Sequence, residues 1–255
     1  MRSGVPGSRT RQHGLIALAA VTLLFGSPLG PSPSWVAMAS SDDLQVDRAS
    51  LSNDTARSQV PRVRPLAFST SQNRFTRFSD NQGWWSTRYG NDAANDNYVV
   101  GESDESGVVY RNFFTFDLSR LGGRVEAARL VLRRYRGGGE ATETLGLYAV
   151  ATAAPRLNHN EGPNRAIFRD LGTGQSYGRF AVATRSPNPY VYLSLNHAAV
   201  ADINAARGRF FSIGGSLLTA GGDCPFEGNC DKLFRYSQGR GMQQLVALLR
   251  EPSIR

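Results

Sequence analysis

The sequence predicts an all-β protein, a jelly-roll-like antiparallel β-sandwich with two short helices. Short runs rich in β-branched and aromatic residues alternate with Gly, Asn, Pro and Ser along most of the chain, which is typical of sandwiches and barrels rather than of βαβ units. The clearest run, residues 108–118, alternates with period two. Phe114, Phe116 and Leu118 share an apolar face that we expect in the core, and Phe113 lies on the other face, either under a neighbouring element or in solvent.

Ten strands are expected between residues 83 and 249. They are residues 83–89, 97–102, 108–118, 127–135, 144–151, 177–184, 190–195, 209–218, 233–236 and 245–249. Residues 127–135 repeat the alternation, with Leu130 and Leu132 inward. The opposite face of that strand carries Arg129, Val131, Arg133 and Tyr135. Between these two strands, Asp117 is expected to hydrogen-bond the backbone of the turn that follows it.

Two short helices are expected to interrupt the strands. Residues 163–170 have Pro163 near the start and Gly172 just beyond the end, and residues 196–207 have Asn196 as the expected N-cap and Gly208 as the stop. The face formed by Ala199, Val200 and Ile203 suits a helix that covers one end of a sandwich.

The N-terminal 39 residues are predicted to be a signal peptide. Three arginines precede the uncharged run Leu15–Phe25, and a small-residue site follows at Ala37-Met38-Ala39, which is the order of a secretory signal. Residues 40–72 are rich in Ser, Asp, Arg and Pro and predict a disordered linker. The domain itself is expected over residues 73–250. No later segment is apolar enough to span a membrane, so we expect a secreted protein, extracellular or periplasmic.

Charge and cysteine content narrow the possible partners. The formal net charge is +8, yet the one dense basic run is Arg133-Arg134-Tyr135-Arg136, which favours a solvated surface over a nucleic-acid stripe. We therefore expect no nucleic-acid partner. The close pair Cys224 and Cys230 predicts one disulfide, because an exported chain with two cysteines and no neighbouring ligand set does not suggest a zinc site.

The chain resembles secreted bacterial β-sandwich modules of the DNRLRE type, which are related to carbohydrate-binding modules. The resemblance rests on Arg111, Phe114 and Phe116-Asp117-Leu118-Ser119, followed by the pattern of Val125, Ala128, Leu130 and Leu132. It is closer still to uncharacterised exported proteins that carry a C-terminal PEP-CTERM sorting signal, over residues 83–249. We expect no such signal in this chain, because Glu251-Pro252 is followed by three residues and no apolar helix. The resemblance implies a sandwich fold and says little about chemistry.

Catalytic patterns are weak, and we expect no enzyme. The sequence GQSYG at residues 174–178 matches G-x-S-x-G formally, but the serine leads into a strand, and His197 precedes Asp202, contrary to the context that a nucleophile elbow requires. The acidic residues Glu102, Asp104 and Glu105 belong to one loop, whereas glycoside hydrolysis needs carboxyl groups that face each other across a cleft.

The candidate ligand site is an aromatic and amide cluster early in the domain. Ring faces with a few polar groups are typical of sugar sites. The predicted ligand-binding residues are Trp84, Trp85, Tyr89, Asn97 and Tyr98. Strand alternation places Trp84 and Trp85 on opposite sides, so one is expected in the core, and which one is left open. The other interpretation, that both serve packing, fits the sequence as well.

A structural calcium ion is the one cofactor that the sequence suggests. Asp92, Asn95 and Asp96 supply hard oxygen ligands within one loop, although Asn and Asp are also the usual turn residues. Together these observations favour a secreted, non-catalytic protein that binds polysaccharide or a cell-surface glycan, or that contributes to the extracellular matrix. The alternatives are an extracellular structural protein without a ligand site and, last, a polysaccharide hydrolase or lyase.

Overall fold

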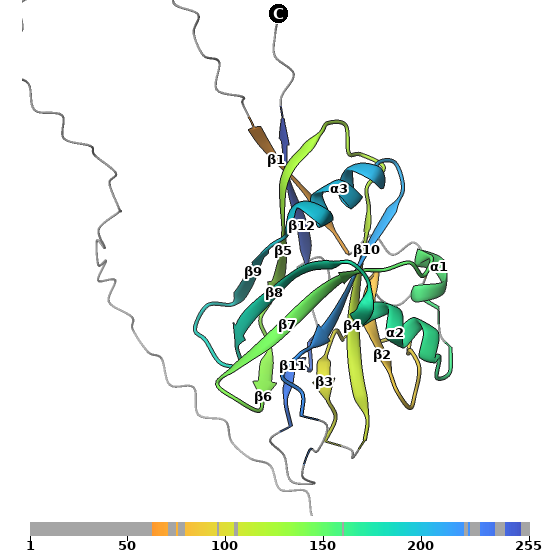
Figure 1. Ribbon diagram of the computed structural model, residues 1–255, viewed down its shortest axis with the longest axis vertical. Helices are drawn as coiled ribbons and strands as arrows, with labels where there is room; N and C mark the ends of the chain where they lie inside the picture. The colour runs from red at the N-terminus through yellow and green to blue at the C-terminus, as the bar shows by residue number, and fades with distance from the viewer. Residues whose placement is uncertain are drawn as a thin grey trace, which may run out of the picture. The chain divides into compact units, whose positions relative to one another are not determined.

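The described residues form two antiparallel β-sheets, as the sequence predicts for an all-β sandwich (Figure 1). They also contain three helices where two were predicted, and the short α1 (Ala154–Leu157) was missed. The computed structural model describes residues 63–70, 75, 80–95, 97–104, 107–159, 161–221, 224, 230–237 and 243–250. The predicted signal peptide, residues 1–39, and the linker up to residue 62 lie outside the described residues. Among the residues that are described, no helix has both the length and the apolar character needed to cross a membrane.

The smaller layer is a four-stranded sheet. Its strand order is β1 (Val63–Ser69), β12 (Gln244–Arg250), β5 (Val125–Arg133) and β9 (Tyr190–Ser194). Every neighbouring pair is antiparallel. Strands β1 and β9 are therefore the edges of this sheet.

The larger layer is an eight-stranded sheet, called here the large sheet. Its order is β6 (Arg136–Gly138), β11 (Lys232–Arg235), β3 (Val100–Glu102), β4 (Val109–Asp117), β10 (Phe210–Leu217), β7 (Thr142–Ala149) and β8 (Ser176–Ala183). Strand β2 (Gln82–Ser86) also pairs with β4.

All ten predicted strands overlap strands of the structure, and two further strands were missed. Strand β6 is short, and β1 lies inside the stretch predicted to be linker, residues 40–72, so that prediction is wrong for residues 63–69. The Pro and Arg content of β1 concealed it. Pro65 is tolerated because β1 pairs on one side only, with β12, and Phe68 joins the core with 2% of its surface exposed.

The main core lies between the sheets and contains the predicted apolar face of β4. Phe114, Phe116 and Leu118 are completely buried there with Leu130 and Leu132 of β5. The turn after β4 also follows the prediction, since the Asp117 carboxylate accepts a hydrogen bond of 2.9 Å from the Ser119 N–H.

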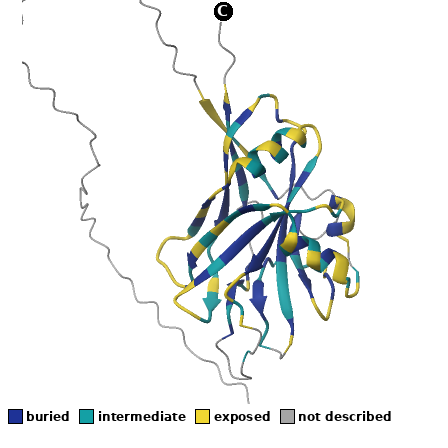
Figure 2. Ribbon diagram, in the orientation of Figure 1, coloured by how far each residue is buried: buried dark blue, intermediate teal, exposed yellow. Residues whose placement is uncertain are grey.

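Phe113 lies in a second apolar cluster on the other face of the large sheet. It packs with Trp85, Leu157, Ile167 and Leu171. Leu157 belongs to α1 (Ala154–Leu157), and the last two belong to α2 (Arg165–Thr173). Figure 2 shows the exposed colour on the outer sides of these helices, while β10 is mostly buried. The large sheet is thus covered on both faces around β4.

Of the predicted helix signals, the Asn196 N-cap is confirmed, whereas α2 begins after Asn164 and not at Pro163. Asn196 caps α3 (His197–Ala205) by accepting from the Ala199 N–H. Gly172, predicted beyond the end of its helix, lies inside α2. A Cβ atom at this position would lie 2.6 Å from Cζ of Arg111, whose guanidinium donates to the carbonyl oxygen of Phe168 at 2.8 Å. The glycine therefore makes room for the arginine that joins β4 to α2.

The predicted disulfide between Cys224 and Cys230 is present, with the two Cα atoms 5.0 Å apart. It precedes β11, where Lys232, the only lysine of the chain, is 3% exposed and pairs with the Asp104 carboxylate. Asp104 also pairs with Arg235 at 2.7 Å. Its hydrogen bond to Lys232 and both positive charges lower the pKa of the Asp104 carboxyl, which keeps the ion pair formed at neutral pH.

Truncation of Phe113 tests the second cluster. Because Phe113 is 1% exposed, Phe113→Ala is expected to lower the free energy of unfolding by about 3–5 kcal/mol. Phe113→Leu keeps most of the apolar contact and should cost clearly less. Urea unfolding measures both, and an equal, negligible effect of the two variants would contradict the cluster.

Glu143 is a buried carboxyl whose ionised form is disfavoured. It is 0% exposed in β7, where it accepts hydrogen bonds from the Glu140 N–H at 2.9 Å and from the Thr219 hydroxyl. Burial raises the pKa of Glu143, and the nearby Asp231 and Glu140 charges add to that effect. The folded state therefore binds a proton more tightly than the unfolded state does at this group.

The sign of the pH dependence follows. Where the folded pKa lies above the unfolded one, stability falls as pH rises from the ordinary glutamate value upward through the folded pKa. We expect Glu143→Gln, which stays neutral, to match the parent protein at about pH 4 and to be more stable than it at about pH 7. Urea unfolding at both pH values measures the difference, and a variant that is less stable at neutral pH would contradict this assignment.

Candidate functional site

Two of the five predicted ligand-binding residues are buried, which corrects the sequence-based assignment. Trp85 and Tyr98 are both 0% exposed, so neither ring face is available to a sugar in this conformation. The Trp85 indole N–H donates to the carbonyl oxygen of Leu157 at 3.0 Å and holds α1 against the large sheet. Of the two tryptophans, Trp85 is therefore the packing residue.

Tyr98 connects the two sheets from inside the core. Its hydroxyl donates to the carbonyl oxygen of Arg133 at 2.8 Å, and it accepts from Nε2 of Gln243 at 2.8 Å. Its ring contacts Phe114 edge to face, with ring centroids 5.3 Å apart. Tyr98 comes just before β3 of the large sheet, whereas Arg133 ends β5 of the four-stranded sheet. An aromatic residue that the sequence suggests for a surface thus has a structural role.

The other three predicted residues retain some accessible surface. Tyr89 is 47% exposed, and Trp84 is half-buried with its ring edge-to-face against Tyr110, the centroids 5.1 Å apart. Asn97 is half-buried and accepts a 2.6 Å hydrogen bond from the Ser237 hydroxyl. Their role in binding stays a prediction.

In the predicted calcium loop, side-chain oxygens accept hydrogen bonds from backbone N–H groups of the same loop. The Asp92 carboxylate accepts from the Ala94 N–H and the Asn95 side-chain oxygen accepts from the Asn97 N–H, each at 3.0 Å. Both are turn contacts of the kind that Asp and Asn commonly make. Asp96 lies outside the described residues. In the described part of the chain, no group of three or more His, Cys, Asp or Glu could hold a metal, so calcium remains a prediction from the sequence alone.

The residues of the weak catalytic patterns have structural partners. Ser176 begins β8 and follows α2 instead of a strand. Asp202, on α3, accepts a 2.8 Å hydrogen bond from the Tyr177 hydroxyl, and together with burial this raises the pKa of Tyr177. Glu102 is buried in β3, Asp104 pairs with Lys232, and Glu105 lies outside the described residues.

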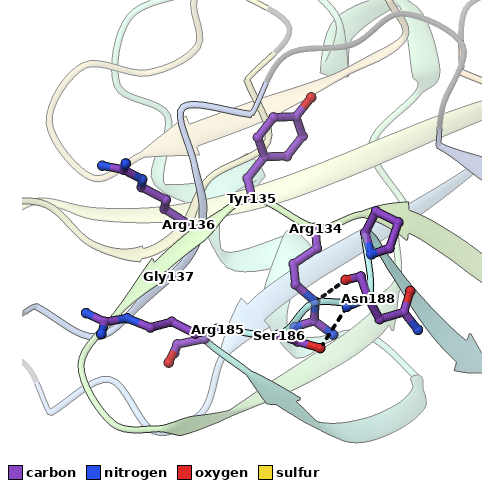
Figure 3. A pocket seen from close by; sticks show the side chains of 9 residues that line it. Arg134, Tyr135, Arg136, Gly137, Arg185, Ser186 and Asn188 are labelled. Carbon is purple, nitrogen blue, oxygen red and sulfur yellow. Dashed lines mark hydrogen bonds between the residues drawn. The ribbon is translucent and has the colours of Figure 1, made fainter. Parts of the chain in front are cut away.

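The structure adds a site that the sequence reasoning missed, a pocket of about 650 Å³ lined by arginines (Figure 3). It has two walls. The first is the connection between β5 and β6 with the start of β6, and the second is the connection between β8 and β9. The lining residues of the first are Arg134, Tyr135, Arg136 and Gly137, and those of the second are Thr184, Arg185, Ser186, Asn188 and Pro189. We call this site the arginine pocket.

Arg134 holds the two connections together. Its main-chain N–H donates to the carbonyl oxygen of Pro189 at 2.7 Å. Its Nε donates to the carbonyl oxygen of Asn188 at 3.0 Å, and its Nη1 donates to that of Ala183. Desolvation lowers the pKa of the Arg134 guanidinium, which still remains a cation at neutral pH because arginine titrates far above it. Its role is to position the pocket wall.

The backbone segments at Gly137 and Thr184 lie close together and complete the pocket wall. The Gly137 N–H donates to the carbonyl oxygen of Thr184 at 3.3 Å, and a Cβ atom on Gly137 would lie 2.8 Å from Cβ of Thr184. A residue with a side chain would therefore push the two connections apart.

Arg136 and Arg185 supply the available charge of the pocket. Both are exposed, and Figure 3 shows their side chains extending to the same side. Ser186 and Asn188 add hydrogen-bonding groups, and the described residues of the lining include no carboxylate, histidine or cysteine. Guanidinium groups bind carboxylate, sulfate or phosphate through paired hydrogen bonds. The pocket can therefore recognise an anion.

One signal of this site was visible in the sequence. The run Arg133-Arg134-Tyr135-Arg136 stood out as the one dense basic stretch and was interpreted as solvated surface. The opposite wall, about residues 184–189, follows more than forty residues later, and the β5–β9 pairing and the hydrogen bonds of Arg134 and Gly137 bring it there.

No family model matches the chain, and no curated protein matches it either. The resemblance to DNRLRE-type modules accordingly stays a prediction, while the sandwich fold that it implies is present.

Removal of the Tyr98 hydroxyl tests the connection between the sheets. Tyr98→Phe leaves the Arg133 carbonyl and the Gln243 amide without this buried partner, which is expected to cost about 1–3 kcal/mol of unfolding free energy. Tyr236→Phe, at a side chain with 61% exposure, is the matched control and should change stability by less than about 0.5 kcal/mol. Equal stability of the two variants in urea would show that the Tyr98 hydroxyl does not join the sheets.

Proposed function

We propose that this chain is a secreted, non-catalytic β-sandwich protein that binds an acidic polysaccharide through the arginine pocket. The observation that carries the proposal is the lining of the pocket, in which Arg134, Arg136 and Arg185 lie beside Tyr135, with hydroxyl and amide groups and without a carboxylate. Arginine matches planar carboxylate and sulfate groups, whereas the Tyr135 ring packs against the main core and the Tyr98 ring.

Export supports a glycan as the partner. The N-terminal sequence has the order of a secretory signal, and the Cys224–Cys230 disulfide fits an oxidising compartment. Outside the cell, carboxylated and sulfated polysaccharides are abundant anionic polymers that a positively charged protein can meet. The formal net charge is +8, and it is +5 without Arg2, Arg9 and Arg11 of the predicted signal peptide. This positive charge favours such an encounter through long-range attraction.

The first experiment compares one acidic and one neutral polymer. The purified protein is expected to bind polygalacturonate and not dextran in affinity electrophoresis, and added salt should weaken the binding because exposed charges are screened. Arg136→Ala and Arg185→Ala should each raise the Kd about tenfold or more, since a charge-assisted hydrogen bond contributes about 1.5–3 kcal/mol and about 1.4 kcal/mol corresponds to tenfold.

Two controls separate this site from its alternatives. Arg120 lies in an exposed turn before β5, at the end of that strand away from the pocket. Arg120→Ala also removes one positive charge and should leave binding unchanged. Tyr89→Ala tests the site predicted from the sequence. Binding that depends on Tyr89 and not on Arg185 would move the site to the early aromatic cluster, and no retention on either polymer would favour a structural protein without a ligand site.

A further inference from the structure

We propose that the ligand is an extended anionic polysaccharide chain, which continues from the arginine pocket along the outer face of the four-stranded sheet. This inference rests on the proposed function and adds a second contact surface to it. That surface is the arginine–tyrosine row, defined as Arg129, Arg133, Tyr190 and Tyr192. It uses the polar face of residues 127–135, which the pocket alone does not explain.

Strand register places the row on one face, away from the core. Strands β5 and β9 pair Arg133 with Tyr190 and Val131 with Tyr192, and side chains of directly paired residues point to the same side of a sheet. The alternate residues, including Leu130 and Leu193, are buried in the main core. The row therefore lies on the face opposite the main core, along the neighbouring strands β5 and β9 that Figure 1 labels.

Contacts within the row make it continuous with the pocket. The Tyr190 and Tyr192 ring centroids are 6.4 Å apart, and the Arg129 guanidinium lies 5.7 Å from the Tyr192 centroid. At the other end, Arg133 lies 5.6 Å from the ring centroid of Tyr135, which lines the pocket. Tyr192 is 54% exposed, so a ring face of this row is open to a ligand.

Charge specifies the class of polymer. The strands of the four-stranded sheet contain four arginines and one acidic residue, Glu126. Glu126 lies near the start of β5 and pairs with Arg250 at 3.0 Å, whereas Arg133 ends that strand. The part of the face beside the pocket is therefore positive, which favours a chain with repeated negative groups.

The dimensions favour a polymer over a small anion. Arg129 and Arg133 are about 13 Å apart along β5, because a strand rises about 3.3 Å per residue. A monosaccharide in the pocket cannot reach Arg129, whereas an oligosaccharide can. Guanidinium groups interleaved with tyrosine rings offer such a chain both ion pairs and apolar ring faces.

The test is the dependence of affinity on chain length. The full chain is titrated by calorimetry with the di-, tetra- and hexasaccharide of an unbranched uronic acid polymer. We expect the affinity to rise with length. Tyr192→Ala and Arg129→Ala should weaken hexasaccharide binding about tenfold and leave the disaccharide unchanged, whereas Arg185→Ala should weaken all three.

Matched variants keep the test specific to the row. Tyr236→Ala removes another exposed tyrosine with an arginine near its ring, 4.6 Å from Arg235 to the centroid, and should bind like the parent protein. Arg129→Lys keeps the charge and should retain part of the hexasaccharide affinity. Melting temperatures of all variants are compared, so that a loss of folding is recognised as such.

The outcomes distinguish this inference from the function on which it rests. Equal affinity for all lengths, or hexasaccharide binding that is insensitive to Tyr192→Ala, would overturn the row and leave the pocket as the binding site. No binding of any oligosaccharide by the parent protein would overturn both. Tighter binding of a single-stranded oligonucleotide than of the hexasaccharide would show that the class of polymer is wrong.

Discussion

The buried hydroxyl of Tyr98 determines how the two sheets of this sandwich meet. It belongs to the segment that enters β3 of the large sheet, and it donates to the last carbonyl oxygen of β5 in the four-stranded sheet. The chain leaves that carbonyl at Arg133 and passes directly into the pocket wall at Arg134. A buried hydrogen bond adds little net stability to the fold. Removing one of its partners destabilises the fold more strongly, because the other partner stays buried without a hydrogen bond. The position of the arginine pocket thus depends on a contact that a ligand never touches.

The two sheets have different surroundings, and this difference locates the binding surface. The large sheet has the main core on one face and, around Phe113, the cluster with α1 and α2 on the other. The four-stranded sheet contributes one face to the core, while Arg129 and Tyr192 extend from its other face. A covered sheet supplies rigidity, and a sheet with one solvated face can present side chains at fixed spacing. Within the described residues, the arginine–tyrosine row lies on this second kind of surface, beside the arginine pocket.

Local patterns predicted the elements well and the long-range environment poorly. Period-two alternation identified the core face of β4, and Asn196 marked the start of α3, because both signals act within a few residues. The same patterns could not tell what covers Phe113, or that Tyr98 lies inside, since both answers depend on segments far away in the chain. The arginine pocket was missed for the same reason. Arg134 and Asn188 are 54 positions apart, and neither side of the pocket suggests a binding site by itself.

The pairing of β1 with β12 has a mechanical consequence. These strands are antiparallel neighbours, and Val63 lies opposite Arg250 at one end of the pair, so the first and last residues of the described sandwich are adjacent. Tension applied between those ends acts along the hydrogen bonds, which run perpendicular to the strands, and it opens the pairs one after another. Shearing two long strands past each other would instead load all the bonds at once. A domain pulled at both of these residues therefore yields first by separation of β1 from β12, at low force. Tension between one of them and a polymer bound on β5 and β9 loads the sheet along a different direction.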